Sequence, residues 1–98
     1  MIIKEVIEQL EAATHPVAKV LHKGDYFKVL VIGFKKGMKL KEHVAPLQSK
    51  LTVISGKVVY EQGEQKTELQ KFDEISIPVN ITHSVKALDD SLCLLTQG

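Results

Sequence analysis

The spacing of hydrophobic and polar residues changes once along the chain. Ile3, Ile7 and Leu10 recur at helical spacing and charged side chains fill the other face, which predicts an amphipathic helix over Ile2–Ala13. Pro16 follows, and the residue before a proline is driven out of the helical region, so the helix ends there. A helix this short is marginal alone, so its apolar side must pack against the rest of the chain or against a partner subunit.

From residue 17 onward the period is that of β-strands. Short runs rich in β-branched, aromatic and aliphatic residues are separated by turn residues such as Gly, Asp and Ser. The runs are Val17–His22, Tyr26–Phe34, Met38–His43, Leu51–Ile54, Lys57–Glu61, Lys66–Leu69, Glu74–Ile77, Ser84–Ala87 and Leu92–Thr96. No segment between them is long enough for a helical crossover, so we expect an all-β sandwich or barrel. The expected division is residues 1–16 as helix and linker and residues 17–98 as the β-domain.

Composition narrows the class of protein. The 98 residues are 44% hydrophobic and carry a formal net charge of +1, which suits one folded domain. The sequence shows no transmembrane segment and no secretory leader, so the expected location is the cytoplasm and no membrane partner is expected. All 13 basic residues are lysine, and tryptophan is absent. Without arginine forks or a basic patch with aromatic residues, we expect no nucleic-acid partner.

Cys93 is the single cysteine of the chain. One cysteine forms no internal disulfide and builds no thiolate metal site by itself. It lies in the apolar run Leu92–Leu95, where a cysteine behaves as a small hydrophobic residue. We therefore expect it to be buried and unreactive.

Two segments resemble the paired motifs of the cupin family of small β-barrels. The first runs from Gly37 to Gly56 and contains His43, where the family has a glycine, a His-x-His pair, a carboxylate and a closing glycine. The second is Pro78–His83, where the family has Pro-x-Gly-x-x-His. The resemblance covers the chain from Val17 onward. It implies an antiparallel cupin-type β-barrel, a jelly-roll-like double sheet, with the short helix at its N-terminus.

The metal-ligand set that the resemblance implies is incomplete here. His43 and His83 fill two of the family's four ligand positions, whereas Ala45 and Ser49 stand where the second histidine and the carboxylate belong. Alanine has no donor atom, and a neutral serine hydroxyl is a poor ligand for a divalent transition metal. Asn80 replaces the family glycine of the second motif, and asparagine tolerates left-handed backbone better than most residues.

These residues leave three functions open. The first is metal-independent binding of a small molecule in a cavity lined by His43, Gln48, Ser49, Leu51 and His83, with no cofactor. The second is a metal-dependent dioxygenase or isomerase that holds Fe, Mn, Ni or Zn with the two histidines and an unrecognised third ligand. A weaker variant is a metal-free enzyme with one histidine as general base. The third is a regulatory or interaction module assembled as a dimer. Catalytic residues cannot be assigned.

A homodimer is also expected. The segment Leu51–Ile54 carries apolar residues on both of its faces, so the face of Ile54 must be covered by a second sheet or by another subunit. The resemblance to cupins points the same way, because small single-domain members of that family commonly dimerise.

Tyr60 and Phe72 are candidates for the cavity mouth, although aromatic residues in strands usually belong to the core.

Overall fold

The computed structural model describes all of residues 1–98 and contains one helix and nine strands. The elements are α1 (Ile2–Leu10), β1 (Val17–Lys23), β2 (Lys28–Phe34), β3 (Lys39–His43), β4 (Ser49–Ser55), β5 (Lys57–Gln62), β6 (Gln65–Gln70), β7 (Glu74–Ile77), β8 (His83–Ala87) and β9 (Ser91–Gln97). All nine predicted strands are confirmed. The helix ends at Leu10, short of the expected end at Ala13.

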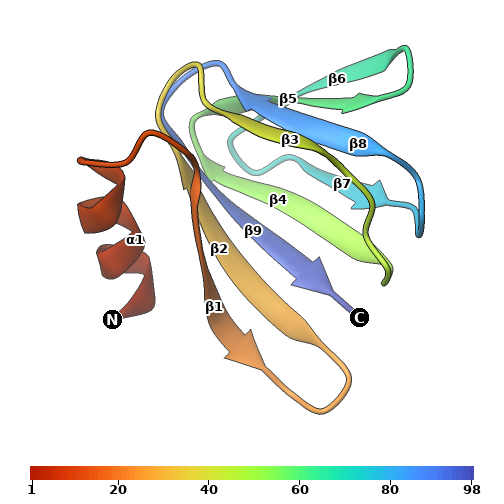
Figure 1. Cartoon of the computed structure of the whole chain (residues 1–98), viewed down its shortest axis with the longest axis horizontal. Coiled ribbons are helices and arrows are strands. Elements are labelled where there is room, and N and C mark those ends of the chain that lie inside the picture. The colour runs from red at the N-terminus through yellow and green to blue at the C-terminus, as the bar shows by residue number, and fades with distance from the viewer.

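The strands form two antiparallel sheets that face each other (Figure 1). One sheet has the order β1-β2-β9-β4-β7, and the other has the order β3-β8-β5-β6. Sequence neighbours are often not sheet neighbours, because the chain crosses between the sheets as in a jelly roll. The all-β double sheet expected from the strand rhythm is therefore confirmed.

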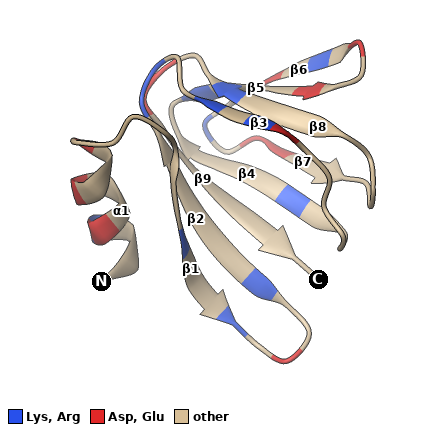
Figure 2. Ribbon diagram, viewed as in Figure 1, with Lys and Arg blue, Asp and Glu red and all other residues tan.

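The core lies between the sheets and consists of inward-facing side chains from both. In β4 the alternation is regular: Ser49, Leu51 and Val53 are buried, while Lys50 points outward. The same alternation in β8 turns His83, Val85 and Ala87 inward. The core cluster comprises Ile32, Phe34, Leu51, Val53, Val58, Tyr60, Leu69, Ile77, Val85, Ala87, Cys93 and Leu95. This core contains no charged residue, and the charged positions coloured on the ribbon of Figure 2 leave β9 free.

Helix α1 packs on the outer face of the five-stranded sheet, over β1 and β2 (Figure 1). Its Val6 is fully buried. The close approach depends on Gly33 of β2, where an added Cβ would lie 2.8 Å from Cγ1 of Val6. The part of the apolar side that is centred on Val6 therefore packs on its own chain. Ile3 and Ile7 remain 36% and 47% exposed.

A backbone hydrogen bond connects the β3–β4 loop to the β7–β8 loop. The amide of Asn80, between β7 and β8, donates to the carbonyl of Ala45, between β3 and β4, at 2.9 Å. Asn80 adopts a φ of 60°, the left-handed conformation for which the family uses glycine. Asparagine can occupy this position because it tolerates left-handed backbone better than most residues.

The structure contains no helix with the length and hydrophobicity needed to cross a membrane.

Candidate functional site

His43 and His83 lie directly opposite each other in the sheet. His43 is the last residue of β3 and His83 is the first of β8, and the two are register partners. The register shifts between Leu40 and His43, so β3 has one residue more than β8 over this stretch. Such a bulge reverses the alternation of the strand beyond it. It allows both Leu40 and His43 to face the same side of the sheet as His83.

The two imidazoles face each other at close range. Their ring centroids are 4.2 Å apart and their planes are inclined by 59°. Nδ1 of His43 lies 2.7 Å from the carbonyl oxygen of Lys41, and Nδ1 of His83 lies 3.1 Å from that of Ile81. A carbonyl only accepts, so Nδ1 carries the hydrogen in both rings. In the neutral rings each Nε2 is therefore an acceptor.

His83 is the buried member of the pair. Its exposed fraction is 3%, and the Tyr60 ring stacks beside it with centroids 5.7 Å apart and planes 26° apart. Burial lowers the pKa of His83 below its ordinary 6.5, the hydrogen bond that His83 donates to the Ile81 carbonyl opposes this, and the charge of His43 lowers the pKa further. Burial also raises the pKa of the Tyr60 hydroxyl. Both side chains are therefore neutral at pH 7.

The small exposed part of His83 includes its acceptor atom. Nε2 of His83 has no hydrogen-bond partner, since the only bond of this side chain is made by Nδ1. No buried side-chain nitrogen or oxygen in the protein lacks a partner. Nε2 must then lie at the accessible surface. The site presents a neutral acceptor beside the exposed ring of His43, and the buried ring of Tyr60 supports the His83 ring.

The other residues of the expected cavity lie in different surroundings. Leu51 belongs to the packed core. Ser49 is buried, and its hydroxyl donates to the carbonyl of Leu47 at 3.0 Å. Gln48 and Ser49 line a polar hollow of about 330 Å³ beside Lys50 and Ser76, and His43 lines another of about 400 Å³. His83 lines neither, so the structure brings the two histidines together but not with Gln48 and Ser49.

The donor set does not fit a resident metal ion of the usual kind. A mononuclear catalytic metal takes at least three converging protein donors and keeps an open position. His43 and His83 supply two imidazoles, and no group of three or more His, Cys, Asp or Glu side chains in the chain could hold an ion. The hydroxyls of Ser49 and Tyr60 already donate hydrogen bonds within the protein.

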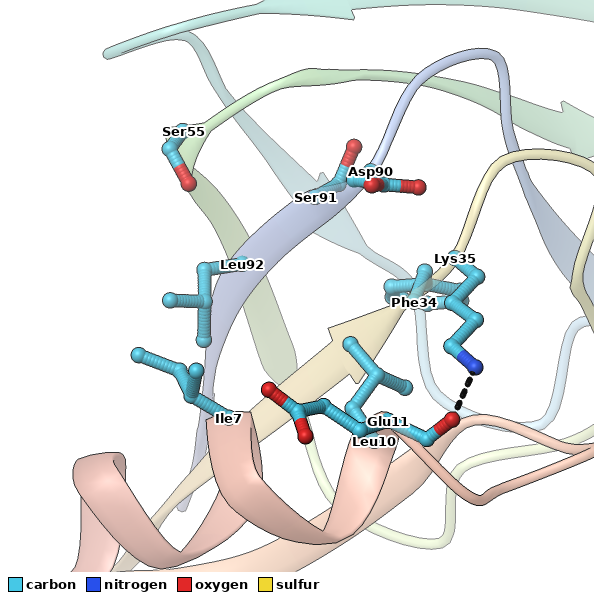
Figure 3. A pocket seen from close by; sticks show the side chains of 9 residues that line it. All are labelled: Ile7, Leu10, Glu11, Phe34, Lys35, Ser55, Asp90, Ser91 and Leu92. Atoms are coloured by element: carbon cyan, nitrogen blue, oxygen red, sulfur yellow. Dashed lines mark hydrogen bonds between the residues drawn. The ribbon is translucent and has the colours of Figure 1, made fainter.

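A groove beside α1 was not foreseen from the sequence. It has a volume of about 340 Å³ and lies between the C-terminal end of the helix and the adjoining ends of β2, β4 and β9 (Figure 3). Its lining residues are Ile7, Leu10, Glu11, Phe34, Lys35, Ser55, Asp90, Ser91 and Leu92. The one available signal was Gly33, since a glycine inside a strand pattern marks close approach of another element.

Comparisons with known proteins identify the fold. No family model matches the chain, and no curated protein matches it. Solved structures do: a cupin superfamily protein from Desulfitobacterium hafniense has a TM-score of 0.80 at 17% identity, with 86% of this chain and 77% of that chain covered. An RmlC-like cupin protein from Desulfovibrio desulfuricans has a TM-score of 0.78 at 23% identity, with 89% of each chain covered.

A cupin 2 conserved barrel domain protein from Leptotrichia buccalis has a TM-score of 0.80 at 26% identity. The alignment covers 93% of this chain but only 45% of that one, so this chain corresponds to about half of the larger protein. The chain has the cupin fold. The resemblance carried by Gly37–Gly56 and Pro78–His83 is confirmed at the level of the fold.

Proposed function

We propose that this small cupin-fold domain binds a small molecule at the His43–His83 pair without a metal. The observation that carries the proposal is the arrangement of the two rings. Each Nδ1 is held by a backbone carbonyl, and Nε2 of the buried His83 reaches the surface without a partner. A ligand that donates a hydrogen bond to this nitrogen would satisfy it.

The chemistry of the pair favours a neutral ligand with an O–H or N–H group. His83 is neutral at pH 7 because burial lowers its pKa, so Nε2 accepts rather than donates. The neighbouring ring of His43, an exposed residue, offers a flat surface on which an unsaturated or ring-shaped ligand packs, whereas the Tyr60 ring is buried in the core. A small number of convergent polar groups within mostly apolar walls is typical of small-molecule sites.

Nitrogen NMR of the histidine rings tests this proposal. We expect a neutral donor such as phenol or benzamide to shift the Nε2 resonance of His83, because hydrogen bonding changes the electron density at the acceptor. His83→Phe should abolish binding, whereas His22→Phe should not, since His22 lies exposed against Phe27. Unchanged ring resonances with every neutral donor tried would contradict the proposal.

The metal-dependent dioxygenase or isomerase stays the alternative because one observation favours it. A histidine that binds a metal through Nε2 usually donates its Nδ1 hydrogen to a carbonyl or carboxylate, as both rings do here. Metal analysis of protein purified without any chelator separates the two functions. The binding proposal expects no retained Fe, Mn, Ni or Zn. One equivalent per chain, lost in both His43→Ala and His83→Ala, would establish the alternative.

We also propose that the chain forms a homodimer. β1 is an edge strand of its sheet, and its Val20 and Leu21 are 41% and 37% exposed. An edge strand with exposed apolar residues is a template for pairing with another strand. Pairing of two β1 edges would extend the five-stranded sheet across a twofold axis.

A further inference from the structure

The groove beside α1 has an apolar interior. Ile7 and Leu10 of the helix lie opposite Phe34 and Leu92 of the sheet, and Ile7 is 47% exposed although it faces this space (Figure 3). When an apolar molecule covers a half-exposed aliphatic side chain beside a concave surface, burial of that side chain stabilises the complex. The volume of about 340 Å³ lies at the lower end of the range of small-ligand pockets.

The charges around the groove do not balance. Lys35 donates its ammonium hydrogen to the backbone carbonyl of Glu11, and in Figure 3 this group points away from the groove. The carboxylate of Asp90 accepts from the amide of Lys36 at 2.8 Å. The carboxylate of Glu11 has no ion pair, and Figure 3 shows it directed toward the space between Ile7 and Leu92.

The helix adds to the negative potential at this position. Glu11 is the C-cap of α1, so it stands at the end of the helix that carries partial negative charge. The last turn itself contains no basic residue, and the Lys35 ammonium on the Glu11 carbonyl offsets part of this charge from outside the helix. A positively charged group near Glu11 would therefore be favoured mainly by the carboxylate, which has no ion pair.

We propose that this groove binds a small organic amine with an apolar body. The ammonium group pairs with the Glu11 carboxylate, and the body packs against Ile7, Leu10 and Leu92. This site is separate from the histidine pair, because neither His43 nor His83 lines the groove. The proposal therefore stands or fails independently of the function proposed above.

Phenethylamine, phenethyl alcohol and hydrocinnamate are the probes, because they share an aromatic body and differ in charge. Titration of each into the full chain is followed by amide NMR. We expect phenethylamine to shift the amides of Leu10, Glu11 and Leu92, with an affinity about three- to fivefold above that of the alcohol, the size of one exposed ion pair. The negatively charged hydrocinnamate should bind more weakly than either.

Glu11→Gln should remove the preference for the amine and leave binding of the alcohol unchanged. Glu8→Gln is the matched control, since it makes the same charge change on the same helix at an exposed residue outside the groove. Ile7→Asn should weaken the amine and the alcohol alike. These substitutions alter exposed positions, so the fold is expected to survive them.

Three results would overturn the proposal. The first is equal affinity for amine and alcohol in the unaltered chain. The second is an equal loss in Glu11→Gln and Glu8→Gln, which would indicate only a general charge effect. The third is shifts that appear at the groove with protein concentration alone, because a second copy would then be its occupant.

Discussion

Single side chains at the site owe their properties to their positions in the fold. His83 is an ordinary histidine in the sequence, but the inner face of β8 buries it and lowers its pKa. Its motif position was predictable from Pro78–His83. The stacking of Tyr60 was not, because Tyr60 reaches His83 through the pairing of β5 with β8, which no local pattern encodes. Phe72, the other aromatic candidate, is 75% exposed in a turn.

The lowered pKa of His83 makes folding dependent on pH. Above pH 6.5 the ring is neutral in both folded and unfolded chains. As the pH falls below this value the unfolded chain takes up a proton first, so stability is lost, by at most about 1.4 kcal/mol per pH unit for one group. Urea unfolding from about pH 7.5 to about pH 5 should show this loss, and His83→Phe should reduce it.

His22→Phe is the control for that measurement, because His22 is exposed. The loss of stability below pH 6.5 should persist in this variant. Identical pH profiles for His83→Phe and the unaltered chain would show that His83 does not titrate differently on folding.

Cys93 provides a second test at this scale. The thiol is buried in β9, as expected from its apolar run, and burial raises its pKa to about 12. Because the thiolate is the reactive form, iodoacetamide should leave the folded protein unmodified at pH 8 and modify it once urea unfolds the chain. Mass spectrometry reads the outcome. Labelling of the folded protein at the rate of a free thiol would contradict the burial.

At the scale of elements, the helix and the β3 bulge determine where the two sites lie. The helix was predictable from the spacing of Ile3, Ile7 and Leu10, but the face of the sheet that it covers was not. The face that the helix covers depends on the close approach of Gly33 and Val6, which lie far apart in the sequence. The bulge after Leu40 was equally hidden, because an extra residue in one strand is defined only by its partner strand.

Gly33→Ala should loosen the attachment of α1. The new Cβ would stand 2.8 Å from Cγ1 of Val6, so the helix must shift, at a cost of about 1–3 kcal/mol in the free energy of unfolding. Val6→Ala in the same chain removes the clashing methyl groups, and the double variant should lose less than the sum of the two single variants. Additive losses would show that the two residues do not touch.

At the scale of the whole molecule, the homodimer is the prediction that concerns its assembly. Sedimentation equilibrium should give twice the mass of the chain, and Leu21→Lys should give the mass of one chain, because charge on an edge strand opposes pairing. Lys66→Glu on β6, the edge of the other sheet, is the control and should leave the dimer intact. A single-chain mass for the unaltered protein would end the proposal.

Strand rhythm and the two motif segments were enough to predict the fold, because alternation and turn residues are local signals. The incomplete ligand set was also visible, since Ala45 and Ser49 stand at named motif positions. The separation of Gln48 and Ser49 from His83 was not, because it depends on how two sheets face each other. The charge arrangement around Glu11 likewise requires the positions of segments far apart in sequence.

The place of β9 has a consequence for how the protein is made. Within the larger sheet the pair β1-β2 and the pair β4-β7 share no hydrogen bonds, and β9 alone joins them. On the ribosome the earlier strands emerge first and remain without their common neighbour until Ser91–Gln97 has been translated. Folding of the barrel must therefore be a late, concerted event dominated by distant pairings, and the emerging chain exposes the aliphatic strand β2 to chaperones until then.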